Sequence, residues 1–125
     1  MWIDNHYNPM NNVIADKSYA FALRIVKLYK HIVSTHKERA MSIQVLRSGT
    51  SVGANVEEAI GGYSRKEFAS KMSIAYKEAR ETKYWIRLLR DSDYIESVPA
   101  QSLLDDCEEL LKLLGSIIRT TRKPK

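Results

Sequence analysis

The chain has 125 residues, 44% of them hydrophobic and 28% charged, with a formal net charge of +5. This length fits one ordinary domain, and the composition is too apolar for a disordered protein. The longest uninterrupted apolar run, Tyr19 to Leu23, is far shorter than the roughly 20 residues that cross a bilayer, and no signal segment follows Met1. We therefore expect one folded domain in the cytoplasm, without a membrane partner.

The first predicted helix follows a segment without hydrophobic periodicity. Residues 1–15 are rich in Asn and predict an irregular lead-in. From Asp16 the apolar side chains recur at spacings of three and four, which predicts an amphipathic helix ending near Ser34. Thr35 to Glu38 has the form of a capping box, so a second helix is expected to start there.

The second predicted helix contains two interior glycines, Gly49 and Gly53. Each costs about 1 kcal/mol relative to Ala inside a helix. Either the helix breaks between Ser48 and Ser51, or the glycines let a neighbouring helix approach closely. We favour one continuous helix.

Two further helices complete the chain. Gly61 and Gly62 end the second helix, and the capping box Ser64 to Glu67 opens a third. The core-facing residues of this third helix recur alternately four and three positions apart, to about Arg90. Ser97 to Pro99 has the form of an N-cap followed by a first-turn proline, and predicts a fourth helix ending near Thr120. Residues 121–125 are expected to form a flexible basic tail.

Four helices joined by short loops run antiparallel to their sequence neighbours. The sequence therefore predicts an all-α fold, an antiparallel up-down-up-down four-helix bundle over residues 16–120.

The sequence contains none of the motifs that we looked for as signs of a catalytic or metal-binding site. The histidines His6, His31 and His36 do not form the Glu-x-x-His pairs of di-metal bundles. No glycine-rich phosphate loop is present, and the only cysteine, Cys107, falls on the predicted core face, where it should pack as a small apolar residue. We expect no catalytic site, no metal and no cofactor, and hence no enzyme.

A one-sided basic stripe marks the third helix. Residues 63–90 carry eight Lys or Arg against three acids. At 100° per residue, most of these cations fall within an arc of about 140° that also holds Tyr76 and Tyr84. Cations mixed with aromatic rings are typical of surfaces that follow a nucleic-acid backbone. The candidate nucleic-acid-binding residues are Arg65, Lys66, Lys77, Arg80, Lys83, Arg87 and Arg90.

Two alternatives to nucleic-acid binding stay open. Charge on a helix exterior is often only solvated, and the acidic run from Asp105 to Glu109 on the fourth helix could neutralise the stripe within the bundle or across a subunit boundary. A further face of the third helix carries Ile74, Trp85 and Leu88. An exposed Trp with two aliphatic side chains predicts a contact between subunits.

Small and polar residues interrupt the second helix between Ser48 and Glu58. One interpretation is structural, with Asn55 and a glutamate hydrogen-bonded to neighbouring helices. The other is that Asn55, Glu57 and Glu58 line a subunit contact or a small-molecule pocket.

The same segment carries a family resemblance. Ser51, Asn55 and Glu58, followed by Gly-Tyr-Ser-x-x-Glu-Phe from Gly62 to Phe68, closely resemble the four-helix-bundle proteins named for 23S rRNA intervening sequences. The resemblance spans about residues 16–120, and Gly53 stands where proline is frequent. It implies a homopentamer, and a similarity to accessory proteins of diversity-generating retroelements, whose basic surface contacts nucleic acid and a reverse transcriptase.

These observations predict a non-enzymatic homo-oligomer, a pentamer by the resemblance, that binds RNA or an RNA–protein complex through the basic stripe. The alternative is a protein-interaction scaffold without a nucleic-acid partner, in which the stripe pairs with the acidic helix of the next subunit.

Overall fold

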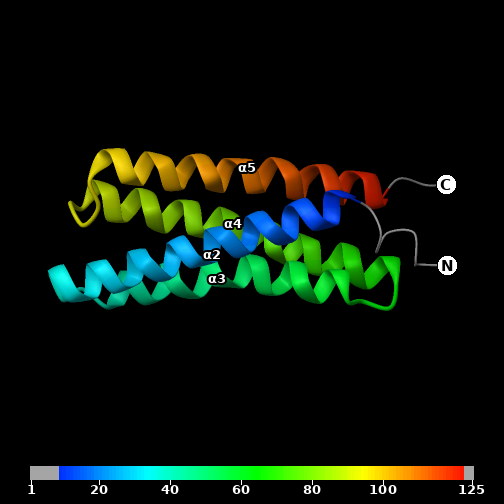
Figure 1. Cartoon of the computed structure of the whole chain (residues 1–125), viewed down its shortest axis with the longest axis horizontal. Helices are drawn as coiled ribbons and strands as arrows, with labels where there is room; N and C mark the ends of the chain where they lie inside the picture. Colours follow the sequence, from blue (N-terminus) through cyan, green and yellow to red (C-terminus); the bar gives the residue numbers. More distant parts are fainter. Residues whose placement is uncertain (1–8, 123–125) are drawn as a thin grey trace.

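The computed structural model describes residues 9–122, which form four long helices. They are α2 (Pro9–His36), α3 (Ala40–Ile60), α4 (Arg65–Asp91) and α5 (Ser97–Arg122). Each helix packs against the next, and α5 closes the ring against α2 through the least extensive of the four contacts. The start of α2 and the end of α5 lie at the same end of the bundle (Figure 1). The predicted up-down-up-down four-helix bundle is confirmed.

The first helix begins earlier than its hydrophobic pattern predicted. α2 starts at Pro9 rather than Asp16, so the expected irregular lead-in is wrong for residues 9–15, and residues 1–8 lie outside the described part of the chain. Proline suits a first helical position because the N–H that it lacks has no partner there. The buried face of α2 includes the polar side chains Asn11 and Ser18, which conceal the apolar period.

The cap of α3 is provided by Glu38 instead of Thr35. α2 continues through Thr35 to His36, so the predicted capping box is wrong. The chain reverses at Lys37, whose φ is +59°, and the Glu38 carboxylate accepts hydrogen bonds from the N–H of Met41 at 3.0 Å and of Ser42 at 2.9 Å. Burial by itself would raise the pKa of Glu38, but these hydrogen bonds outweigh it and lower the pKa.

The remaining helix ends lie close to the predicted positions. The Ser64 side chain accepts a hydrogen bond from the N–H of Glu67 at 3.0 Å, which confirms it as the N-cap of α4. Ser97 is the first helical residue of α5 and not a residue before it. α5 also continues to Arg122, so the expected tail is wrong for residues 121 and 122, and residues 123–125 lie outside the described residues.

The two glycines of α3 allow α2 to approach closely. α3 is continuous from Ala40 to Ile60, as the sequence favoured. A Cβ added to Gly49 would lie 2.8 Å from Cγ1 of the buried Ile25, and one added to Gly53 would lie 3.3 Å from the carbonyl oxygen of Ser18. Close contact with α2 therefore explains why glycine stands at these positions.

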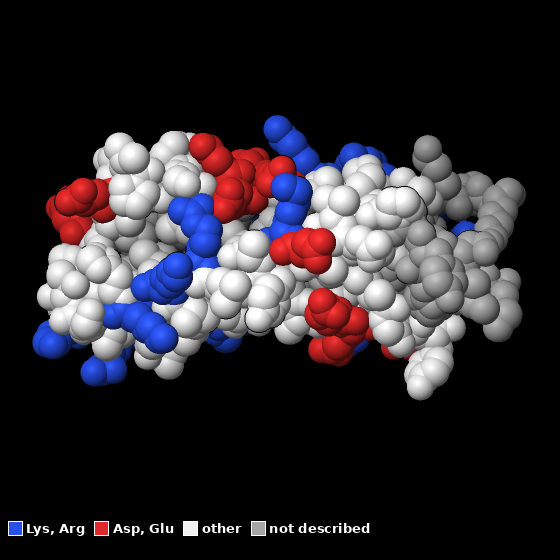
Figure 2. All heavy atoms as spheres, viewed as in Figure 1, with Lys and Arg blue, Asp and Glu red and all other residues white. Residues whose placement is uncertain are grey.

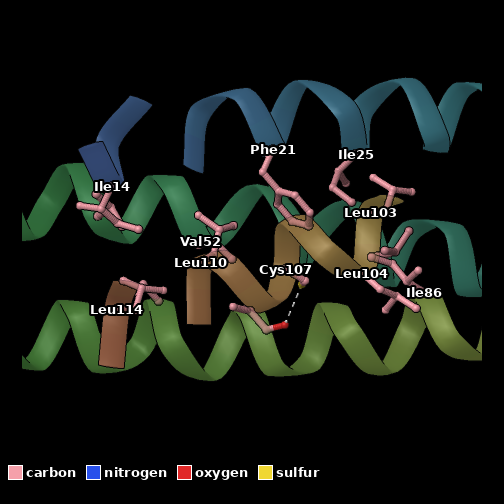
Figure 3. Close-up of a cluster of buried hydrophobic side chains, with 14 of the residues drawn as sticks. Ile14, Phe21, Ile25, Val52, Ile86, Leu103, Leu104, Cys107, Leu110 and Leu114 are labelled. Carbon is pink, nitrogen blue, oxygen red and sulfur yellow. Dashed lines mark hydrogen bonds between the residues drawn. The ribbon is translucent and has the colours of Figure 1, made fainter. Parts of the chain in front are cut away.

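The core is formed by all four helices. Phe21, Val52, Ile86 and Leu110, one from each successive helix, belong to it, and Cys107 lies within it (Figure 3). The Cys107 thiol donates to the carbonyl of Ala79 at 3.4 Å. Burial raises the pKa of Cys107 to about 12, so the predicted role of this cysteine as a core residue is confirmed.

Candidate nucleic-acid interface

Five cationic side chains border a groove between α4 and α5. This α4–α5 groove has a volume of about 580 Å³. Its cationic lining residues are Arg80, Lys83 and Arg87 from α4 with Lys112 and Arg119 from α5. A smaller hollow of about 270 Å³ shares Arg119 with the groove and extends to Arg122 near the end of α5.

Helical spacing explains why these side chains converge. Arg80, Lys83 and Arg87 lie three and four residues apart, so they occupy one face of α4. Lys112 and Arg119 lie one heptad apart on α5, with Gly115 between them. The two faces border each other because α4 and α5 are antiparallel neighbours.

A single carboxylate lines the groove. Glu108 lies 2.5 Å from the ammonium of Lys83, and the hydrogen bond from Lys83 lowers the pKa of Glu108. Within residues 9–122, Arg80, Arg87, Lys112 and Arg119 form no ion pair with a carboxylate. The groove therefore keeps a positive charge that an anionic ligand could neutralise.

Two other acids of α5, Asp106 and Glu109, face α2. Asp106 lies 2.6 Å from Arg24, and Glu109 lies 3.2 Å from Lys17. Figure 2 shows acidic side chains over α5 beside basic side chains over α2 on this face of the bundle. Within the described chain the acidic run consequently neutralises the basic stripe only at Lys83.

The residues of the predicted basic stripe do not all line the α4–α5 groove. Lys66 and Lys77 line a separate hollow along α4 that also reaches Arg122. Arg90 lines a hollow near the α4–α5 loop and pairs with Asp91 at 2.8 Å. Arg65 lines none of these hollows. The structure thus brings together the central part of the stripe, Arg80, Lys83 and Arg87, without its ends.

Comparison with known proteins identifies the family. Residues 10–116 match the family described as 23S rRNA-intervening sequence protein. The chain belongs to this family. A solved structure, that of a protein of unknown function from the S23 ribosomal protein family of Bacteroides thetaiotaomicron, is similar with 51% identity and a TM-score of 0.87, covering 88% of this chain and 98% of that one. A search of the curated proteins gave no match.

Three of the residues that carried the resemblance to the 23S rRNA-intervening sequence family, Ser51, Asn55 and Glu58, lie on α3 outside its buried face. The Ser51 hydroxyl donates to the carbonyl of Arg47 at 2.6 Å, and the Asn55 amide donates to the carbonyl of Ser51 at 2.8 Å. The expected hydrogen bond from Asn55 to a neighbouring helix is therefore wrong. Glu58 does reach α4, where it pairs with Lys71 at 3.0 Å, whereas Glu57 is exposed.

Trp85 occupies a different environment from the predicted one. It is half-buried, packs against the core, and its indole N–H donates to Glu81 at 2.9 Å. This hydrogen bond, followed by one from Arg47 of α3, lowers the pKa of Glu81. The expectation of an exposed Trp is wrong, because α3 reaches over this face of α4.

The other two residues of the predicted subunit contact differ in exposure. Leu88 is half-buried and Ile74 is 38% exposed. Two large side chains on α2 are more exposed than Ile74: Tyr19 is 66% exposed and Leu23 is 51% exposed. These two residues are four positions apart and so lie on one helix face.

Sequence reasoning missed the contribution of α5 to the groove. It considered the basic stripe on one helix, placed Arg122 in the basic tail and did not include Lys112 and Arg119. Their spacing of seven and three residues places them on one face of α5. That spacing, together with the antiparallel packing of α4 and α5, is the signal that could have found them.

Residues 9–122 contain no group of three or more His, Cys, Asp or Glu side chains placed to hold a metal ion. None of their helices is long and apolar enough to cross a membrane.

Proposed function

We propose that this protein binds RNA through the α4–α5 groove. The observation that carries the proposal is the convergence of five cations from two helices around a groove with one carboxylate. Cations that replace the counterions of a nucleic-acid backbone provide affinity that decreases with salt. Membership of the 23S rRNA-intervening sequence family is compatible with an RNA ligand.

We further propose that the RNA-binding form is a homo-oligomer, a pentamer by the resemblance stated above. The exposed Tyr19 and Leu23 on α2 provide an apolar surface that a second subunit could cover. Several grooves on one particle would strengthen binding to a long RNA through effective concentration. Light scattering measures the mass of the particle directly.

The central experiment compares two double variants that remove the same charge. Arg80→Gln with Arg119→Gln removes two groove cations, whereas Lys27→Gln with Lys30→Gln removes two exposed cations of α2, outside the groove. Fluorescence anisotropy with a labelled unstructured RNA, titrated at several salt concentrations, gives both affinity and salt slope. The groove variant should bind roughly tenfold more weakly or worse, and its slope should fall by about 1.4, because each phosphate contact to a single strand contributes about 0.7.

The α2 variant should retain nearly the affinity of the wild-type protein. Equal losses in the two variants would mean that only net charge matters, and absent or salt-insensitive binding would refute the proposal.

A protein-interaction scaffold is the competing function. In that arrangement the stripe pairs with the acidic helix of the next subunit, but Asp106 and Glu109 already have partners on α2 of their own chain. Light scattering at low and high salt separates the two cases, because subunits joined by charge should dissociate at high salt. A nucleic-acid-processing protein, as for the retroelement accessory proteins, would be a further partner of the bound RNA.

A further inference from the structure

Tyr84 presents an aromatic ring at the wall of the α4–α5 groove. The residue is 53% exposed and lines the groove beside Arg80 and Arg87. Its ring makes an edge-to-face contact with Trp85, with centroids 5.1 Å apart and planes at 75°. Trp85 is in turn held by its hydrogen bond to Glu81. The Tyr84 ring is therefore oriented by a fixed neighbour while remaining accessible to a ligand.

Gly115 opens the opposite wall. It lies inside α5, where glycine costs about 1 kcal/mol relative to Ala, and its φ is not positive. A Cβ there would lie 3.3 Å from Nη1 of Arg119 and 3.7 Å from Cε2 of Tyr76. The Arg119 atom is the far end of a flexible side chain of the same helix, and the Tyr76 atom on α4 lies at ordinary van der Waals distance, so close helix packing does not explain this glycine. Its effect is to leave the edge of Tyr76 uncovered in the groove.

The size and lining of the groove favour one strand over two. Its volume of about 580 Å³ is that of a small-ligand pocket and suits a short stretch of nucleic acid. In an A-form duplex the bases stack on one another and their faces are hidden from a protein side chain. A single strand can turn a base out onto an aromatic ring while neighbouring cations hold its phosphates.

We infer that the α4–α5 groove binds single-stranded RNA, with one base stacked on Tyr84 and the strand passing over Gly115 between Arg80, Arg87 and Arg119. This inference rests on the proposed function and adds the form of RNA that the groove takes. Tyr84 provides stacking, and the cations provide the contacts to phosphates.

The test uses the full chain and two probes, an unstructured single-stranded RNA and a duplex of the same length, in fluorescence anisotropy at several salt concentrations that are matched between the probes. The wild-type protein should bind the single strand more tightly. Tyr84→Leu should lose roughly five- to 150-fold in affinity for the single strand, the range of one lost base–aromatic stack. Its salt slope should not change, because no phosphate contact is removed.

Three further variants separate stacking from general damage. Tyr84→Phe keeps the ring and should retain most of the affinity that Tyr84→Leu loses. Tyr63→Leu removes a tyrosine that is 92% exposed between α3 and α4, outside the groove, and should have no effect. Gly115→Leu fills the groove with a better helix former, so it should keep or raise the melting temperature while losing binding.

The outcomes distinguish this inference from the proposed function. Equal affinity for duplex and single strand, or unchanged binding by Tyr84→Leu, overturns the inference while a loss with Arg80→Gln and Arg119→Gln still supports groove binding. Failure of both RNA forms to bind overturns the proposed function and the inference together.

Discussion

The close contact of α2 with α3 at Gly49 predicts that two apparently similar glycine-to-alanine substitutions, at Gly49 and at Gly115, differ in their effect on stability. In Gly49→Ala the new Cβ would lie 2.8 and 2.9 Å from two carbons of Ile25, which is fully buried and cannot move away freely. Overpacking of this kind costs about 1–3 kcal/mol. In Gly115→Ala the nearest atom, 3.3 Å away, is the end of the Arg119 side chain, which can move.

Both substitutions gain the same helix propensity, about 1 kcal/mol. That gain cancels when the two variants are compared, so the difference in their free energies of unfolding is the overpacking cost at Gly49, about 1–3 kcal/mol. Gly115→Ala should be more stable than the wild type by up to about 1 kcal/mol, whereas Gly49→Ala should range from unchanged to about 2 kcal/mol less stable.

Urea unfolding followed by circular dichroism, at one protein concentration, measures these differences; in thermal unfolding 1 kcal/mol corresponds to about 3–5 °C for a chain of this size. Ile25→Ala provides a control, because it removes the crowded atoms, and Gly49→Ala should then be tolerated better in that background. If Gly49→Ala proves as stable as Gly115→Ala, the close approach of α2 is not the reason for glycine at this position.

Three other predictions concern individual ionisable groups. Glu108→Gln should strengthen RNA binding several-fold and steepen the salt slope by about 0.7, because it releases Lys83 for a phosphate; weaker binding in anisotropy would contradict this role of the pair. Cys107, buried with its pKa raised to about 12, should react with iodoacetamide at pH 8 only after unfolding, so labelling of the native protein seen by mass spectrometry would contradict its burial. The pKa of Glu38 is lowered below its ordinary value of 4.5, so its stabilisation is present above that pH and is lost as the pH falls through the lowered pKa. The difference in melting temperature between wild type and Glu38→Gln should therefore narrow from pH 7 to pH 3, and a constant difference would show that the carboxylate charge does not matter for the cap.

The fold was predictable where local pattern and tertiary packing agree. The heptad seam of α4 and the Ser64 cap depend on residues close in sequence, and both were predicted correctly. The start of α2 was not, because Asn11 and Ser18 are polar yet buried. Burial of a polar side chain depends on which neighbour covers it, and one helix pattern does not contain that information.

The site was predictable only in part for the same reason. The face of α4 that carries Arg80 and Arg87 follows from helix geometry. The environment of Trp85 depends on Arg47 and Glu81, which come from two helices, and the groove depends on Lys112 and Arg119 of a third. A helical wheel shows which residues share a face, but it does not show which other helix lies against that face.

The Ser48 and Thr82 side chains, both fully buried, meet between α3 and α4 with their hydroxyl oxygens 2.9 Å apart. Thr82 also lies 2.7 Å from the carbonyl of Glu78 in its own helix. If α4 slid by one turn along α3, Thr82 would face Val45 or Val52, and the Ser48 hydroxyl would lose its partner in a dry interior, at a cost of about 1–3 kcal/mol. An all-apolar seam would tolerate such a shift far better, so this single polar contact helps to select one alignment of the two helices among several of similar packing.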